Sequence, residues 1–162
     1  MTPVKPQVLA ALNAGIQSEV AAYVFYVTAA KKTQMSSFKG VLEKLALEEK
    51  MHFHILEGEH DSLIRSEKWI STADILKRDG LPEIGEEMSE THRDLINQVQ
   101  HASTVQTILD IAYRLEEEAY ELFDGEAKRA EAPEARKIFE ELSKFEQGHM
   151  VIISKMIKEY KG

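Results

Sequence analysis

The same spacing of glutamate and histidine occurs twice in this chain. Each copy has a glutamate, a second glutamate 30 residues later (49 − 19 = 146 − 116 = 30), and a histidine three residues after that. The six repeat residues are Glu19, Glu49 and His52 in the first copy and Glu116, Glu146 and His149 in the second. This duplication predicts two equivalent structural halves, and it constrains the fold more than any other feature of the sequence.

Helical periodicity dominates the chain and predicts four long helices. Apolar residues recur at alternating steps of three and four positions, which places them along one face of an amphipathic helix. A repeat residue interrupts each apolar stripe near its middle. The first helix is expected over about residues 6–32, the second after the N-cap residues Ser36 and Ser37, the third from near Ser103 and Thr104, and the fourth from about Pro133.

The connections between these helices predict an all-α four-helix bundle. Short turns around residues 33–36 and 131–133 favour antiparallel neighbours, so each half is expected to form a helical hairpin. The hairpins cover about residues 6–60 and 103–160. We expect a long, partly helical crossover at about 61–102 to join them into one domain spanning 1–162.

The crossover is expected to contain one or two extra helices. Its sequence is interrupted at Asp79-Gly80-Leu81-Pro82, where glycine and proline favour a break. The segment is long enough to run back along the bundle. It can therefore present the third helix in the orientation that the repeat requires.

Composition excludes several classes of function. The net charge is −8, which leaves no electrostatic basis for binding nucleic acid. The absence of cysteine excludes thiolate nucleophiles, iron–sulfur clusters and Cys-based zinc sites. No secretory signal is evident, and we expect no stretch approaching the ~20 apolar residues of a membrane span. A cytoplasmic protein with no membrane partner is the expectation.

The six repeat residues predict a site for two metal ions inside the bundle. Residues three apart share one face of a helix, so each Glu-x-x-His pair projects inward together. Isolated ionised carboxylates in an apolar core are strongly penalised, and two divalent cations would balance the four glutamates. Oxygen-rich ligation with one imidazole per metal suits iron or manganese better than structural zinc.

The other polar residues near these positions are expected to lie outside the site. Glu117 and Glu118 fall off the apolar stripe that contains Glu116, and Glu48 lies about 100° around the helix from Glu49. All three are predicted to be solvated, and Tyr23 is predicted to be a core aromatic. The remaining histidines are expected to be exposed or structural: His54, His60, His92 and His101.

This pattern resembles the ferritin-like di-iron superfamily, and most closely the rubrerythrin di-iron domain and its stand-alone relatives. The resemblance covers about residues 8–60 and 103–158. It implies that Glu19 and Glu116 are terminal or bridging ligands, that Glu49 and Glu146 complete the bridges, and that His52 and His149 bind one metal each. Members often place a tyrosine seven residues after the first ligand to contact the opposite carboxylate. That residue is Tyr26 here, and its counterpart in the second half is Phe123.

The sequence also departs from the family pattern. Rubrerythrins proper carry a rubredoxin-like domain with four cysteines, so this chain needs an external electron donor. They carry a further carboxylate one turn after the third-helix ligand, where this chain has Ala119. Bacterioferritins bind haem through a methionine directly after the second-helix glutamate. Lys50 occupies that position and Met51 follows it, so no haem is expected, nor is a storage cage.

The resemblance implies a non-haem di-iron oxidoreductase that reacts with hydrogen peroxide or dioxygen in oxidative-stress defence. Two iron ions are the expected cofactors, manganese or a mixed pair is the alternative, and zinc can substitute. A homodimer is also expected by resemblance. Two other functions stay open: a ferroxidase or iron-handling protein, and a sensory or interaction module whose metal is not catalytic.

Overall fold

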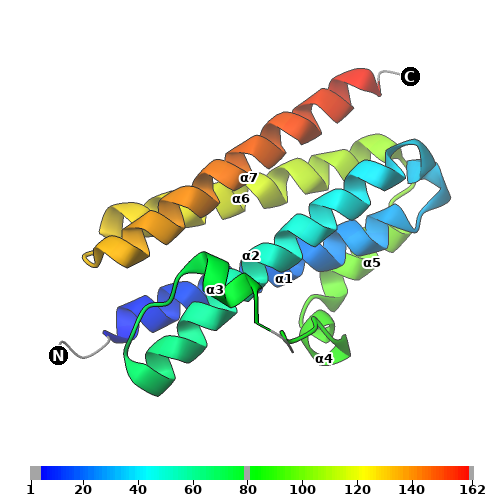
Figure 1. Ribbon diagram of the computed structural model, residues 1–162. Coiled ribbons are helices and arrows are strands. Elements are labelled where there is room, and N and C mark those ends of the chain that lie inside the picture. The colour runs from blue at the N-terminus through cyan, green and yellow to red at the C-terminus, as the bar shows by residue number, and fades with distance from the viewer. Residues whose placement is uncertain (1–4, 79–80, 161–162) are drawn as a thin grey trace.

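Four long helices form the body of the protein. The computed structural model describes residues 5–78 and 81–160, and these contain helices and no strands. The predicted all-α four-helix bundle is confirmed (Figure 1). The elements are α1 (Pro6–Ala30), the 3₁₀ helix η1 (Thr33–Phe38), α2 (Lys39–Ser66), α3 (Thr72–Leu76), α4 (Glu86–Glu90), α5 (Arg93–His101), α6 (Val105–Arg129) and α7 (Pro133–Glu159).

The long helices are arranged as the two expected hairpins. Helix α1 packs along α2, and α6 packs along α7. Helix α1 also contacts α6 and thereby joins the two hairpins. Figure 1 shows the hairpins side by side, with the crossover elements on the side of the α1–α2 pair.

Three of the four predicted helix starts are confirmed, and α1 begins at Pro6 as expected. Thr104 is the N-cap of α6, and its hydroxyl accepts the backbone N–H of Thr107 at 3.1 Å. Pro133 is the first residue of α7, where a proline costs no hydrogen bond. The predicted serine cap of α2 is wrong, because Ser36 and Ser37 lie inside η1. This turn is itself helical and is anchored by the fully buried Met35, so the chain enters α2 without a serine cap.

The described residues of the crossover form three short helices, α3, α4 and α5, and not the one or two that were expected. Of the predicted break, Leu81 and Pro82 are non-helical, while Asp79 and Gly80 lie outside the described residues. Helix α3 packs closely on α2, because Ile75 is fully buried against Gly58. A Cβ atom at residue 58 would lie 2.7 Å from Ile75 Cγ2, so glycine is needed there.

The end of the crossover is attached to the first hairpin by one lysine. The Nζ of Lys32 donates to the backbone oxygens of Val99 and Gln100, both at 2.8 Å, and of Ala102 at 2.9 Å. These carbonyls lie at the C-terminal end of α5, where a helix leaves acceptors unpaired and its dipole favours a positive charge.

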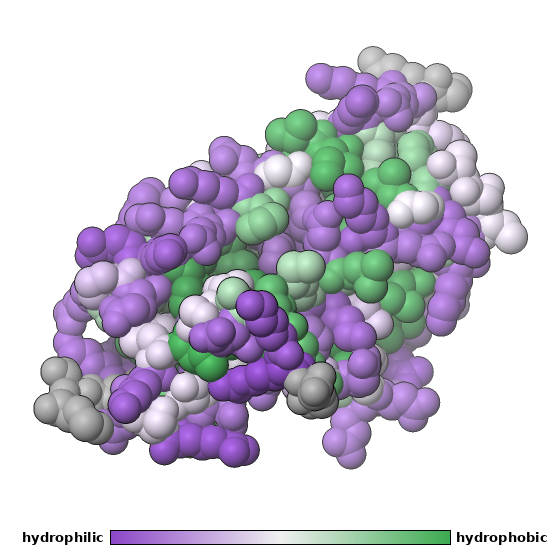
Figure 2. All heavy atoms as spheres, viewed as in Figure 1, coloured by the Kyte–Doolittle hydropathy of each residue, from purple (hydrophilic) through white to green (hydrophobic). Residues whose placement is uncertain are grey.

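Two apolar cores occupy opposite ends of the bundle. One includes Phe25 and Leu42, and the other includes Phe53 and Phe123. The repeat residues lie in the stretch of each helix that separates these cores. Figure 2 shows a mostly hydrophilic surface in which some apolar side chains are exposed. The largest of these on α2 and α7 are Val41, Leu47, Met51, Ile64, Phe145, Val151 and Ile152.

Helix α1 differs from the expectation that no stretch of the chain approaches the ~20 apolar residues of a membrane span. Among the described residues it is the one helix long and apolar enough, by length and composition, to cross a membrane, with a mean hydropathy of 1.3. Half of that apolar window is buried inside the protein, and Glu19 lies within the helix. The apolar character of α1 therefore matches its central place in the bundle, where it contacts both α2 and α6.

A buried carboxylate outside the repeat lies under the crossover. Glu59 on α2 is 1% exposed, and its Oε1 accepts the backbone N–H of Ile70 at 2.8 Å. Burial raises the pKa of Glu59 to about 7, although the hydrogen bond from Ile70 acts in the opposite direction.

Replacing Lys32 with methionine should lower the free energy of unfolding by about 1.5–3 kcal/mol, the usual worth of hydrogen bonds from a charged donor. The apolar stem is kept, so the loss reports the contacts with the end of α5. Denaturant unfolding measures it, and the exposed neighbour Lys31→Met is the matched control. Equal effects of the two substitutions would contradict the role of Lys32.

Replacing Glu59 with glutamine should stabilise the protein increasingly as the pH rises. The folded-state pKa of about 7 lies above the usual 4.5, so the contribution of Glu59 is fully present below about pH 4.5 and is lost as the pH rises through 7. Each unit of difference in pKa corresponds to about 1.4 kcal/mol. Unfolding curves of parent and variant from pH 5 to 8 measure the difference, and parallel pH profiles would contradict it.

Candidate metal centre

The four long helices bring all six repeat residues to the middle of the bundle. Helix α1 contributes one glutamate, α6 contributes one, and α2 and α7 each contribute a glutamate and a histidine. Each of the six residues is at most 2% exposed: Glu19, Glu49, His52, Glu116, Glu146 and His149. The sequence-predicted set thus meets at one place between the two apolar cores.

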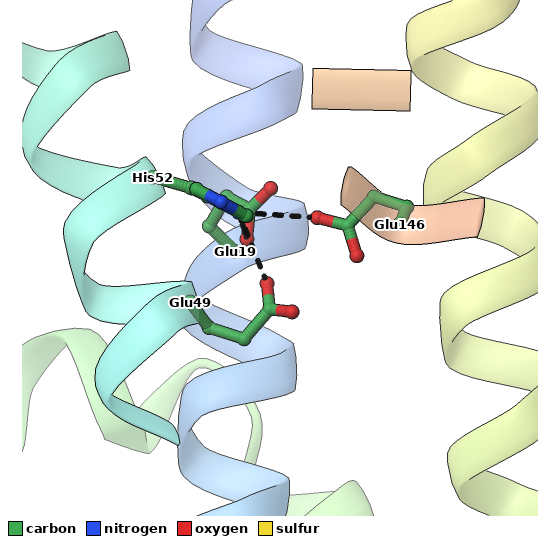
Figure 3. Close-up of side chains that lie close together, drawn as sticks. All are labelled: Glu19, Glu49, His52 and Glu146. Carbon is green, nitrogen blue, oxygen red and sulfur yellow. Dashed lines mark ion pairs between the residues drawn. The ribbon is translucent and has the colours of Figure 1, made fainter. Parts of the chain in front are cut away.

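The six residues form two overlapping groups of four. The candidate ligand atoms within each group lie within 4.8 Å of one another. The groups are Glu19, Glu49, His52 and Glu146, and Glu49, Glu116, Glu146 and His149. Figure 3 shows the first group, whose side chains converge from α1, α2 and α7. Glu49 and Glu146 belong to both groups, so each could help to hold a cation in either one.

Both histidines turn Nδ1 towards the carboxylates. His149 Nδ1 lies 2.7 Å from Glu49 Oε1, and 3.4 and 3.5 Å from oxygens of Glu116 and Glu146. His52 Nδ1 lies 3.4 Å from Glu146 Oε1, 3.6 Å from Glu19 Oε2 and 3.9 Å from Glu49 Oε2 (Figure 3). The two rings are stacked, with centroids 6.0 Å apart.

Most candidate ligand atoms of this cluster make no hydrogen bond, although both Nδ1 atoms lie within ion-pair distance of carboxylates. Seven carboxylate oxygens and both Nδ1 atoms of the six residues are buried without a hydrogen-bond partner. Buried polar atoms in proteins are nearly always paired, since leaving them unpaired is costly. Two cations would satisfy these atoms together, and oxygen-rich ligation with imidazole suits iron or manganese. The residues therefore fit a two-metal site.

The electrostatics of the cluster point the same way. Burial, reinforced by neighbouring carboxylates, raises the pKa values of Glu19, Glu49 and Glu116 well above the usual range. Burial also opposes ionisation of Glu146, but the proton-bearing groups around it hold its pKa well below the usual value. For both histidines the nearby carboxylates outweigh burial and raise the pKa. Without cations, the cluster would have to bind protons to limit its negative charge.

Two residues outside the cluster hold its members in position. The Tyr26 hydroxyl donates to Glu116 Oε1 at 2.5 Å, as the resemblance implied. Glu48 was predicted to be solvated, and this is only partly correct: its side chain is 29% exposed, but its Oε2 lies 2.7 Å from His149 Nε2. Glu48 lies about 100° around the helix from Glu49. This direction had suggested exposure to solvent, but it faces His149 on α7. Once His149 turns Nδ1 inward, its outer nitrogen needs such a partner.

The other polar and aromatic residues lie where the sequence predicted, outside the cluster. Glu117 and Glu118 are exposed, and Tyr23 is partly buried against both apolar cores. His101 is exposed, His60 and His92 are partly buried, and His54 is buried beside the ring of Phe53. None of these histidines belongs to either four-residue group.

Fold and site together define a helical bundle with a buried carboxylate–histidine cluster able to hold metal. The chain matches the sequence model of the Rubrerythrin family over residues 10–157, and it belongs to that family. The resemblance seen in the repeat is thereby confirmed, together with the ferritin-like architecture. No curated protein and no solved structure was found to match the chain.

Replacing Glu116 with alanine should reduce the metal bound per chain, because this residue lies in one group of candidate ligands. Glu117→Ala is the matched control, since its side chain is exposed and lies outside both groups. Elemental analysis of anaerobically purified protein gives the stoichiometry of each variant. A loss of metal in Glu117→Ala but not in Glu116→Ala would show that the helical register of the site is wrong.

Proposed function

We propose that this protein is a non-haem di-iron, or di-manganese, oxidoreductase that reduces hydrogen peroxide or dioxygen. The observation that carries the proposal is the pair of four-residue groups sharing Glu49 and Glu146. Two cations in such groups would lie close enough to act on one small substrate, as in other two-metal sites. Membership of the Rubrerythrin family supports the same class of chemistry.

The reaction with peroxide requires an external electron donor. Cleavage of the O–O bond of hydrogen peroxide to give two waters consumes two electrons and two protons. When bound, a pair of ferrous ions supplies these electrons, one each. The chain has no cysteine that could return them, so a separate reductant must restore the starting state.

The protein's own residues would fix geometry and exclude water. Tyr26 holds one oxygen of Glu116, and Glu48 holds the outer nitrogen of His149. Burial, reinforced by the Glu116 carboxylate, raises the pKa of Tyr26 well above its usual value. Tyr26 therefore stays protonated and keeps donating to Glu116. The apolar cores on either side shield the cluster from bulk water.

The setting of this activity is also a proposal. We place the protein in the cytoplasm, acting in defence against oxidants, as a homodimer without nucleic-acid or membrane partners. The exposed apolar side chains of α2 and α7 would gain from burial against a second copy. Light scattering in solution tests the dimer, and a monomer at all concentrations would contradict it.

Stopped-flow measurement of peroxide consumption tests the proposed activity. The reduced, iron-loaded protein with a chemical reductant should consume many equivalents of peroxide per chain, and Glu116→Ala should lose most of this activity. Continuous oxidation of added Fe(II), with release of ferric iron, would instead identify a ferroxidase. Consumption of neither substrate would identify a metal-binding module without catalysis.

A further inference from the structure

The two halves of the cluster are equivalent in ligands but not in the residues that support them. The repeat relates the halves by an offset of 97 residues (116 − 19 = 149 − 52 = 97). The same offset relates Tyr26 to Phe123 (26 + 97) and Glu48 to Phe145 (48 + 97). Each polar supporting residue therefore has a phenylalanine as its counterpart.

Both polar supports act on the same half. Tyr26 donates to Glu116 at 2.5 Å, and Glu48 lies 2.7 Å from His149 Nε2. Glu116 and His149 both belong to the group that includes Glu49 and Glu146. We call the cation position formed by this group the supported position.

The other half has aromatic neighbours in place of these contacts. Phe123 is fully buried and stacks on Phe139, and neither carboxylate oxygen of Glu19 has a hydrogen-bond partner. The ring of Phe145 lies 4.9 Å from the ring of His52. Within the described residues, the carboxylates within ion-pair distance of His52 all belong to the cluster and lie near its Nδ1. We call this the unsupported position.

A carboxylate on the outer nitrogen of a ligating histidine has two effects. It fixes the tautomer and ring orientation, and it makes the inner nitrogen a stronger ligand. Loss of such a partner typically lowers metal affinity about 10–100-fold. The hydrogen bond from Tyr26 likewise restrains the carboxylate of Glu116, whereas Glu19 lacks such a contact.

From this asymmetry we infer that the two cation positions differ in affinity and fill in a fixed order. The supported position, with Glu116 and His149, binds the first cation. The unsupported position, with Glu19 and His52, binds the second about 10–100-fold more weakly and is the one that exchanges metal. Phe145, which covers His52, is 53% exposed, so the weaker position also lies beside a side chain at the protein surface. The inference rests on the proposed two-metal site.

Anomalous X-ray diffraction tests the order of filling directly. Metal-free protein crystallised with one equivalent of Mn(II) per chain should show its main anomalous peak at the supported position. With excess Mn(II), both positions should be occupied. Equal peaks at one equivalent, or a main peak beside His52, would overturn the inference while leaving the two-metal site intact. No peak at any metal concentration would overturn the proposed function as well.

Replacing Glu48 tests whether its contact with His149 causes the difference in affinity. Glu48→Leu should weaken the tighter of two Mn(II) affinities about 10–100-fold, as measured by competition with a fluorescent chelator. Glu43→Leu is the matched control, because Glu43 is an exposed glutamate on the same helix, and it should leave both affinities unchanged. Equal effects of the two variants would contradict a specific role for Glu48.

The reciprocal substitution is made at a residue whose own side chain is largely exposed, although its ring packs beside the buried ring of His52. Phe145→Glu places a carboxylate beside His52 at a largely exposed position, and it should strengthen the weaker affinity so that the two values converge. Circular dichroism of the metal-free proteins confirms folding. If Phe145→Glu is folded and the gap between the affinities is unchanged, the inference is wrong.

Discussion

The structure depends on the burial of four glutamates at the centre of an apolar bundle. Ionised carboxylates in such surroundings are tolerated only with compensating positive charge. In the absence of cations, the two histidines supply part of it by binding protons, and the unpaired oxygens and nitrogens of the cluster show where cations would take over that role. Because each long helix contributes at least one ligand, satisfying this centre also fixes how the two hairpins pack. Binding of cations at this centre would therefore be coupled to folding.

The repeat gives the site its near symmetry, and the neighbouring residues break it. Glu49 and Glu146 are common to both groups, so cations bound there would share ligands and respond to each other. Tyr26 and Glu48 both act on the half that contains Glu116 and His149, whereas Phe123 and Phe145 occupy the equivalent places in the other half. In the proposed oxidoreductase, such a difference gives one cation a fixed place and leaves the other easier to exchange.

Much of the fold and the cluster could be predicted from sequence, because helical period and ligand spacing are local properties. The six clustered residues and the starts of α6 and α7 follow from such patterns, whereas the contact of Tyr26 with Glu116 was implied by the family resemblance. Features set by contacts between distant segments could not be predicted this way. The contact between Glu48 and His149 could not be predicted, because the residue spacing within α2 does not show which side chain of α7 lies opposite. The 3₁₀ turn before α2 depends on burial of Met35, and the three crossover helices depend on packing against α1 and α2.

Thermal unfolding at increasing metal concentration tests most directly whether cations balance the buried charge. A ligand that binds only the folded state raises the free energy of unfolding by RT ln(1 + [L]/Kd), where [L] is the free ligand concentration. The melting temperature of the metal-free protein should rise steeply on anaerobic addition of Fe(II) or Mn(II), with a change of slope at two equivalents per chain. A melting temperature that does not respond to metal would show that the centre of the bundle is not a metal site.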